Sequence, residues 1–216
     1  MKHLTFHFDL ISPFAYLAFE KLPEALMGLS YSVAYQPVLF GAVLGHHGQL
    51  GPAEITPKRD WTYRHVTWLA HHHGVDLQMP AGHPFNPLSL LRLAVACSAD
   101  GQPNRYVTET LFRHVWRGGA DAADPARYQA LVAQLAPQRD PASAEVKEQL
   151  RVATDAALVR GLFGVPTVEV DGRLFWGLDA LPMLRDYLQG GAWFDGPGWD
   201  AAAQVPVGIR RPRNPA

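Results

Sequence analysis

Apolar and polar side chains alternate along residues 3–8, HLTFHF, with the period of a β-strand. Apolar residues then recur at helical spacing from Phe14 to about Met27, and Gly28 ends that run. Residues 31–36, YSVAYQ, return to alternation. The N-terminal part of the chain therefore predicts a strand, a helix and a second strand, which together form a βαβ unit.

The central part of the chain has helical periodicity instead. The pattern predicts helices over residues 57–74, 87–99, 104–118, 125–135 and 143–160. Proline and glycine stand at the boundaries of these segments, as expected for residues that interrupt regular structure. Residues 45–52, GHHGQLGP, precede the helical block and predict a Gly-rich loop.

Strand patterns return near the C-terminal end. TVEV (167–170) and RLFW (173–176) are separated by Asp171-Gly172, which suits a two-residue type I′ turn, so a hairpin is predicted. A last helix is predicted from about Asp179 to Leu188. The residues after it are rich in Gly and Pro and predict an irregular tail.

This order of elements predicts an α/β fold in which a helical insertion interrupts one sheet domain. Residues 1–45 and 161–190 are assigned to the sheet domain, 46–160 to the insertion and 191–216 to the tail. The two halves of the sheet are distant in sequence and must meet in space. A functional site is expected in the cleft between sheet and insertion.

Composition narrows the classes of function. The 216 residues are 48% hydrophobic and 18% charged, with a formal net charge of −1, as in ordinary globular proteins. Such a balance gives no sign of a surface for nucleic acid or for anionic membranes. The longest apolar stretch, 87–99, is too short to span a bilayer and contains Arg92. No export signal is recognisable, so a cytoplasmic location is expected.

Disulfide and metal chemistry are not expected. The single cysteine, Cys97, lies in an apolar predicted helix, where a thiol behaves as a small hydrophobe. His71, His72 and His73 are consecutive in another predicted helix, where successive side chains point about 100° apart. They cannot converge on one ion, so no metal site is predicted.

Three short features have both a structural and a functional interpretation. Ser12 precedes Pro13 at a predicted helix start, and local sequence alone favours a simple N-cap over a reactive group. Val165-Pro166 is either a trans proline at a strand start or a cis-proline loop whose backbone can pair with an extended ligand. Asp179 either caps the last helix or binds the ammonium group of a zwitterion whose carboxylate lies at the helix N-terminus.

The segments FDLISPFAYLA (8–18), HPFNPL (83–88) and FGVPTVEVDGRLFWGLDAL (163–181) together resemble a known family. They are similar to 2-hydroxychromene-2-carboxylate isomerases and to the related kappa-class glutathione transferases, which have a DsbA-type thioredoxin-like fold. The resemblance extends to about residue 190. It implies a thioredoxin-like α/β sheet domain with an all-helical insertion, and an enzyme that uses glutathione.

The resemblance also implies positions for glutathione. Its thiol is expected to face Ser12, the catalytic position, and its cysteinyl backbone to pair with Val165 beside Pro166. Its γ-glutamyl end is expected on the segment Trp176, Gly177, Leu178 and Asp179. The chain has no CxxC motif, which excludes dithiol redox chemistry. A hydroxyl at a helix N-terminus stabilises a thiolate, and lowering a thiol pKa by about two units needs roughly 2.7 kcal/mol.

The family reaction is a cis–trans isomerisation that interconverts 2-hydroxychromene-2-carboxylate and trans-o-hydroxybenzylidenepyruvate through transient thiolate addition. For this chain the resemblance implies 2-hydroxychromene-2-carboxylate, or a similar unsaturated aromatic acid, as the substrate. Lys58 and Asn86 are expected to bind its carboxylate, although Asn86 also suits a plain turn. Gln49 is a third candidate for binding the substrate, at a position where the resembling family often has asparagine, so this chain departs from the family there. Three aromatic residues of the helix predicted over 57–74 either line an aromatic pocket or belong to the core: Trp61, Tyr63 and Trp68.

Two other functions remain open at this point. A kappa-like transferase or peroxidase would make a stable conjugate or reduce a peroxide, and a non-catalytic thiol- or peptide-binding module would keep only the fold. The resemblance further implies a homodimer. Three apolar aromatic residues of the tail are candidate contacts between its subunits: Trp193, Phe194 and Trp199.

Overall fold

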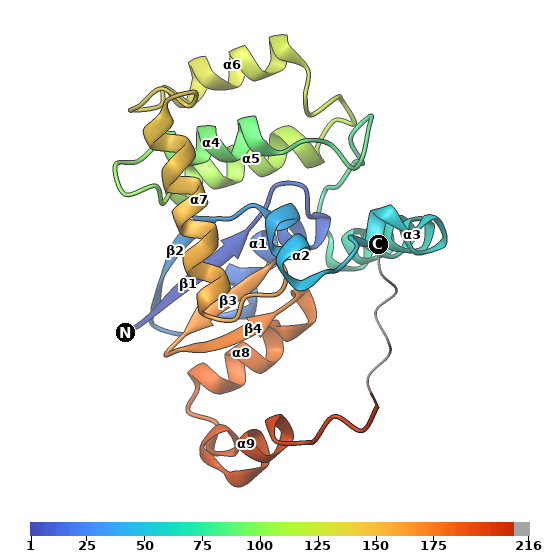
Figure 1. The fold of residues 1–216 in the computed structure, drawn as a ribbon, viewed down its shortest axis with the longest axis vertical. Helices are drawn as coiled ribbons and strands as arrows, with labels where there is room; N and C mark the ends of the chain where they lie inside the picture. Colours follow the sequence, from blue (N-terminus) through green and yellow to red (C-terminus); the bar gives the residue numbers. More distant parts are fainter. Residues whose placement is uncertain (210–216) are drawn as a thin grey trace.

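The computed structural model describes residues 1–209. Among these residues a four-stranded sheet lies at the centre, with strand order β2-β1-β3-β4 (Figure 1). The strands are β1 (Lys2–Phe8), β2 (Tyr31–Pro37), β3 (Thr167–Val170) and β4 (Arg173–Trp176). β1 pairs in parallel with β2 and antiparallel with β3, which pairs antiparallel with β4. The two halves of the sheet therefore meet at β1, as the element order requires.

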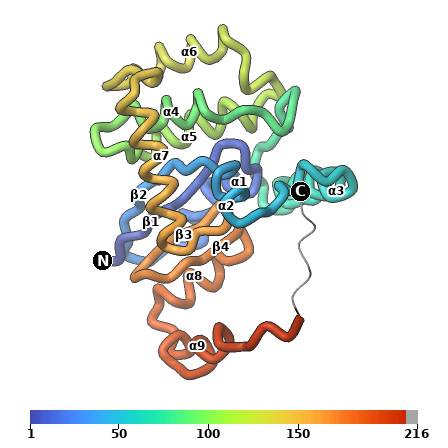
Figure 2. Tube along the Cα trace, viewed as in Figure 1, coloured from blue at the N-terminus to red at the C-terminus, as the bar shows by residue number. Residues whose placement is uncertain are grey.

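Helices form most of the remaining described chain (Figure 2). Those of the first half are α1 (Pro13–Ala25), α2 (Phe40–His47), α3 (Thr56–His73), α4 (Leu88–Ala96) and α5 (Arg105–Trp116). Those of the second half are α6 (Pro125–Leu135), α7 (Ala144–Val159), α8 (Leu181–Leu188) and α9 (Pro197–Ala203). Short 3-10 turns occur at Pro52–Glu54, Leu178–Ala180 and Ala192–Asp195. Among residues 1–209, no helix combines the length and the apolar composition needed to cross a membrane.

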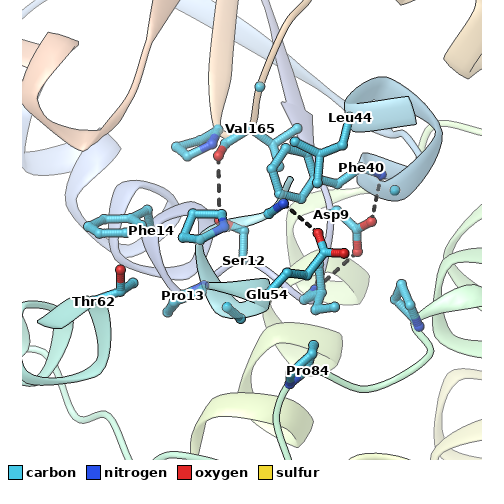
Figure 3. A pocket seen from close by; sticks show the side chains of 18 of the residues that line it. Asp9, Ser12, Pro13, Phe14, Phe40, Leu44, Glu54, Thr62, Pro84 and Val165 are labelled. Atoms are coloured by element: carbon cyan, nitrogen blue, oxygen red, sulfur yellow. Dashed lines mark hydrogen bonds between the residues drawn. The ribbon is translucent and has the colours of Figure 1, made fainter. Parts of the chain in front are cut away.

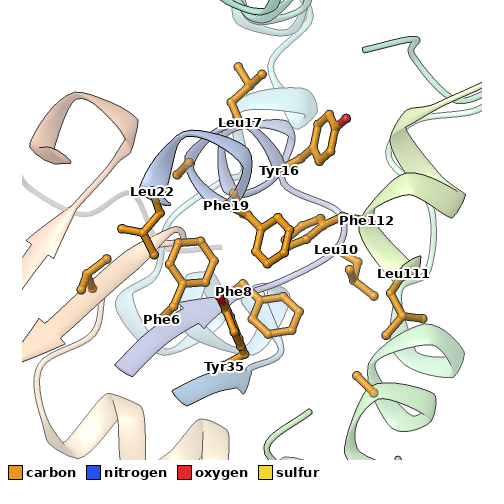
Figure 4. Close-up of a cluster of buried hydrophobic side chains, with 14 of the residues drawn as sticks. Phe6, Phe8, Leu10, Tyr16, Leu17, Phe19, Leu22, Tyr35, Leu111 and Phe112 are labelled. Carbon is orange, nitrogen blue, oxygen red and sulfur yellow. The ribbon is translucent and has the colours of Figure 1, made fainter. Parts of the chain in front are cut away.

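The alternation along β1 gives the sheet two different faces. Phe6 and Phe8 point toward α1, where the Phe6 ring lies 6.3 Å from the Phe19 ring (Figure 4). His7 points to the opposite face, where its Nε2 lies 2.9 Å from the Glu169 carboxylate, which also accepts from Arg160 at the end of α7. The sheet is thus covered by α1 on one face and by α7 on the other (Figure 1).

One hydrophobic core joins the helical part to the sheet. The Phe112 ring of α5 lies 5.3 Å from Phe8 and 5.2 Å from Phe19, all three fully buried. The indole Nε1 of Trp116, also in α5, donates to the carbonyl of Leu10 at 3.0 Å, just after β1. The helices that intervene in sequence therefore pack directly on the element that carries the candidate site.

The predicted strands and helices are confirmed, with boundaries shifted by a few residues. The helix starts follow capping chemistry: the side chains of Ser12, Asn104, Asp124 and Ser143 accept from backbone N–H groups of α1, α5, α6 and α7. Gly74 ends α3 in the left-handed conformation, as the sequence predicted. The division of the chain into domains at residues 45 and 160 stays a prediction.

Two predicted irregular segments contain helix instead. α2 extends over part of the predicted Gly-rich loop, because its left-handed C-cap, Gly48, lies inside that segment rather than before it. The tail forms the turn at Ala192–Asp195 and then α9, because Phe194 is only 2% exposed and packs its ring 6.3 Å from Phe175. The end of the predicted tail, 210–216, lies outside the described residues.

Candidate active site

A cavity of about 990 Å³ opens where the start of α1, the helices α2 and α3, and the loops 83–87 and 163–166 converge (Figure 3). Most of the wall is apolar, with a few polar side chains among it, as in sites for small organic ligands. Every residue assigned to glutathione or substrate from the sequence lines this cavity: Ser12, Gln49, Lys58, Asn86, Val165, Pro166, Trp176, Gly177, Leu178 and Asp179.

Ser12 lies at the N-terminus of α1, with its side chain turned toward the Val165 loop (Figure 3). Its Oγ accepts from the N–H of Ala15 at 3.2 Å, so the N-cap interpretation is confirmed. The same hydroxyl donates to the carbonyl of Val165 at 3.4 Å, a long bond that a better acceptor can replace. Ser12 is only 6% exposed. The cap and the cavity-facing hydroxyl are therefore one group.

The Val165-Pro166 peptide bond is cis, the second of the two geometries considered from the sequence. Pro166 continues into β3, and its carbonyl accepts from the N–H of Gly177 at 2.9 Å. Within residues 1–209, no acceptor bonds the N–H of Val165, and its carbonyl receives only the long bond from Ser12. A buried loop thus presents one free donor and one weakly used acceptor to the cavity.

The segment Trp176–Asp179 forms another wall. Gly177 has φ +99°, a backbone conformation in which any other side chain would be strained, and it lies close to the Asp179 carboxylate. The Trp176 indole lies against Gly164, where a Cβ would be 2.5 Å from Nε1. Asp179 is exposed, and its carboxylate has no hydrogen-bond or ion-pair partner in the described part of the chain. It is available to a cationic ligand group at the start of a helical segment.

Three exposed polar residues also line the cavity. Lys58 extends from the first turns of α3 and forms no ion pair with any of residues 1–209. The Asn86 Oδ1 accepts from the N–H of Leu88 at 3.0 Å, so the turn interpretation is confirmed, while no acceptor among residues 1–209 bonds its amide N–H groups. Gln49 follows α2 and has an exposed side chain. The wall offers N–H donors and one cation, the groups that bind a carboxylate.

Asp9 is a cavity residue that the sequence analysis did not identify. It is fully buried directly before the Ser12 turn, and its two oxygens accept from the N–H of Ile11 at 3.0 Å and of Phe40 at 2.8 Å (Figure 3). Burial raises the pKa of Asp9 to about 7, although these N–H groups favour the charged form. The carboxyl holds the Ser12 turn and the start of α2 together.

His83 and Tyr63 form a second group that the sequence analysis did not assign to chemistry. The His83 Nε2 lies 2.8 Å from the carbonyl of Ile11, the residue before Ser12. The Tyr63 hydroxyl lies 2.7 Å from the His83 Nδ1 and 2.8 Å from the His83 carbonyl. The His83-Pro84 bond is cis. The loop 83–87 is thereby attached to both α3 and the Ser12 turn.

The aromatic residues of α3 separate into two groups. Tyr63 lines the cavity, as one interpretation of the sequence predicted. Trp61 and Trp68 were expected in a pocket wall or in the core and lie in neither, since they are 66% and 56% exposed. The buried residues of α3 are instead the smaller Val66 and Ala70.

The thiol of Cys97 lies outside the cavity. Cys97 ends α4, and burial raises the pKa of its thiol to about 11, so it is protonated at neutral pH and behaves as a structural side chain. Within residues 1–209, no group of three or more histidine, cysteine, aspartate or glutamate side chains is placed to hold a metal ion.

Comparison with protein families matches residues 3–189 to the DSBA-like thioredoxin domain. The chain belongs to this family. The match covers the sheet, the helices between its halves and α8, which agrees with the predicted thioredoxin-like fold. This DSBA-like chain carries Ser12 and has no CxxC motif.

Curated relatives include isomerases and transferases. The 2-hydroxychromene-2-carboxylate isomerase of Sphingobium xenophagum is 29% identical over 194 residues, which cover 87% of this chain and 98% of that protein. The protein of the same name from Pseudomonas sp. (strain C18) is 30% identical over 195 residues, covering 87% and 90%. Glutathione s-transferase kappa 2 of Caenorhabditis elegans is 26% identical over 209 residues, covering 87% and 92%. The chain is thus an enzyme of the DSBA-like family, related to isomerases and glutathione transferases.

Solved structures give the same fold. A selenomethionine structure of 2-hydroxychromene-2-carboxylate isomerase superposes with a TM-score of 0.73 at 21% identity, covering 95% of this chain and all of that one (100%). The cytosolic disulfide reductase DsbM from Pseudomonas aeruginosa, with GSH, superposes with a TM-score of 0.52 at 15% identity, covering 94% and 100%. Both comparisons bear on the fold of this DSBA-like chain.

Proposed function

We propose that this chain is a glutathione-dependent cis–trans isomerase of 2-hydroxychromene-2-carboxylate or a similar unsaturated aromatic acid. The observation that carries the proposal is the buried Ser12 hydroxyl, which caps α1 and has only a long bond to Val165 across the cavity. Relatives named 2-hydroxychromene-2-carboxylate isomerase support the reaction class.

The residues present fit glutathione. The free N–H and weakly used carbonyl of Val165 suit an extended peptide that pairs as an added strand. The Asp179 carboxylate has no partner among residues 1–209 and suits the ammonium of the γ-glutamyl group. The N–H groups at the start of the following helical segment suit the carboxylate of that group. A ligand held at these two places extends toward Ser12. Relatives named glutathione transferases support this assignment.

Bound glutathione would supply a thiolate for reversible addition to the unsaturated carbon, which makes the double bond a rotatable single bond. The Ser12 hydroxyl, which donates only a long bond to the Val165 carbonyl, would donate instead to the charged sulfur, the stronger acceptor. The N-terminus of α1 favours the same negative charge. Lys58 and the Asn86 amide line the same cavity and would bind the substrate carboxylate.

Replacing Ser12 by alanine tests the proposal. Ser12→Ala is expected to lower kcat/KM for isomerisation roughly 10- to 100-fold, since a hydrogen bond to a charged group contributes about 1.5–3 kcal/mol. The ultraviolet absorbance of the bound thiolate should titrate about one to two pH units higher in the variant. Unchanged values of both quantities would remove the assigned role from Ser12. Isomerisation that is as fast without glutathione as with it would remove the cofactor.

The kappa relatives support a second candidate, a transferase that joins glutathione to its acceptor. The two reactions differ in their glutathione balance. An isomerase regenerates glutathione, whereas a transferase consumes one molecule for each product. Mass spectrometry of the products with limiting glutathione distinguishes them: many turnovers for each glutathione indicate the isomerase, and a stable conjugate indicates the transferase.

A further inference from the structure

Tyr63 and His83 make more close polar contacts than one neutral histidine and one hydroxyl can satisfy. The carbonyl of Ile11 can only accept, so the His83 Nε2 at 2.8 Å must carry a hydrogen. In a neutral ring Nδ1 is then bare. The Tyr63 hydroxyl has one hydrogen but faces two acceptors, Nδ1 at 2.7 Å and the His83 carbonyl at 2.8 Å.

One additional proton satisfies all three contacts. With Nδ1 protonated, Nε2–H donates to Ile11, Nδ1–H donates to Tyr63, and the Tyr63 hydroxyl donates to the His83 carbonyl. The arrangement therefore complements the imidazolium better than the imidazole. A site built for the charged form of a base stabilises the state in which that base has taken up a proton.

At rest the base is neutral. Burial lowers the pKa of His83, and no charged side chain of the described residues offsets that shift. Burial raises the pKa of Tyr63, while Arg59 and Asp60 of the same helix act on it in opposite directions. Lys58 and Glu54 line the same cavity. Near neutral pH the pair thus consists of a phenol and an unprotonated imidazole nitrogen in contact with it, and both residues line the cavity.

We propose that Tyr63 and His83 form a proton relay that opens and closes the cyclic hemiketal of the substrate, a step separate from the thiolate-dependent rotation at Ser12. This inference rests on the proposed function, because a 2-hydroxychromene is a cyclic hemiketal whose hydroxyl and ring oxygen share one carbon. Both residues line the cavity, and the Tyr63 Oη accepts no hydrogen bond from a neutral His83, so it is free to take up the proton of the hemiketal hydroxyl.

The proton balance of the step is closed. The hemiketal hydroxyl passes its proton to the Tyr63 oxygen, while the Tyr63 proton moves to the His83 Nδ1. The electron pair of the hemiketal O–H bond forms the C=O bond of the ketone. The bond between the same carbon and the ring oxygen breaks, which leaves a phenolate. His83 then returns its proton through Tyr63 to the phenolate. No oxidant, reductant or co-reactant enters, and both protein residues end as they began.

Tyr63→Phe tests the relay because it removes the hydroxyl and keeps the ring, whose centroid lies 5.3 Å from that of His83. Two substrates separate the steps: the chromene, and the cis isomer of benzylidenepyruvate, which lacks the ring hydroxyl and cannot cyclise. With the chromene, Tyr63→Phe is expected to lower kcat about 10²-fold, as for loss of a general acid–base group. With the open analogue, it is expected to match the wild type. Tyr106→Phe, which alters a tyrosine outside the cavity, is the matched control.

His83→Gln tests the second member of the relay. The glutamine amide still donates to Ile11 but cannot take up a proton, so the same selective loss with the chromene is expected. In the wild type, kcat/KM for the chromene should fall on the acid side below the ordinary histidine range, because protonated His83 cannot act as the base. That acid limb should be absent from the residual activity of His83→Gln. Side-chain ¹⁵N NMR of the wild type should show a neutral His83 ring protonated on Nε2, with a shift of the Nδ1 resonance in Tyr63→Phe.

Three outcomes overturn the relay: equal loss with both substrates in Tyr63→Phe, no loss with either, or a His83 ring protonated on Nδ1 alone. A wild type that turns over neither substrate, with or without glutathione, would instead refute the proposed function. Failure of the inference and failure of the proposed function are therefore separate results.

Discussion

At the scale of single residues, the Asp9 carboxyl is fully buried, and burial raises its pKa to about 7. Below pH 3.8, its ordinary pKa, the folded and the unfolded chain both hold the Asp9 proton; between 3.8 and about 7 only the folded chain does. The free energy of unfolding therefore falls as the pH rises through this window, by at most about 1.4 kcal/mol per pH unit, and levels off above about 7.

Asp9→Asn isolates this contribution. The amide has one oxygen for the two N–H groups of Ile11 and Phe40. The free energy of unfolding of the variant is therefore expected to be about 1–3 kcal/mol lower than that of the wild type at acid pH. The difference in free energy of unfolding between the two proteins should then become smaller toward about pH 7, because only the wild type has to ionise a buried carboxyl. Urea denaturation of both proteins over a pH series measures the difference. Parallel stability curves would show that Asp9 does not titrate in this window.

At the scale of elements, α1 combines a structural and a chemical task in one cap. The Ser12 Oγ accepts from Ala15 at 3.2 Å, and at the start of α7 the Ser143 Oγ accepts from Val146 at 3.3 Å. Ser12→Ala and Ser143→Ala are both expected to lower the free energy of unfolding by about 1 kcal/mol. Only the first is expected to lower isomerase activity. Thermal or urea unfolding measured alongside kinetics compares them, and equal losses of activity would leave Ser12 as a cap alone.

The sequence predicted elements well where local pattern and local chemistry agree. β1 and α1 have clear periods and a Ser-Pro start, so their bounds differ from the prediction by only a few residues. α2 and α9 are short, contain glycine, and depend on tertiary contacts that no local pattern reveals. On α3 the exposed tryptophans outweighed the smaller Val66 and Ala70, because aromatic residues dominate a hydrophobic pattern even when they face solvent.

The candidate site shows the same division between local and long-range information. Ser12, Val165 and Asp179 carry motifs, and the structure brings all three to one cavity. Asp9 and His83 carry no motif, and their chemistry depends on burial and on contacts with Phe40, Ile11 and Tyr63 that only the fold creates. The available signals were an acidic residue at the end of an apolar strand and a histidine before a proline, which are too common to select either residue.

At the scale of the whole molecule, the C-terminal segment changes which surface is available for assembly. Phe194 is buried against Tyr187 and Trp199, with ring centroids 5.2 and 5.3 Å away, and Arg173 lies over the Trp199 ring at 5.4 Å. Phe194 and Trp199 are therefore engaged within their own chain. Trp193 packs against both of their rings, at 5.3 and 5.6 Å, but it is 57% exposed, so it keeps surface for a partner.

The predicted homodimer is therefore expected to depend on Trp193. A tryptophan at the centre of an interface typically contributes 2 kcal/mol or more, so Trp193→Ala should raise the dimer dissociation constant by about 30-fold or more. Sedimentation velocity over a concentration series measures this constant. Trp61→Ala, which removes a similarly exposed tryptophan from α3, is the matched control and should leave assembly unchanged. A wild type that stays monomeric at every concentration contradicts the dimer, and a shift in Trp61→Ala alone moves the interface to α3.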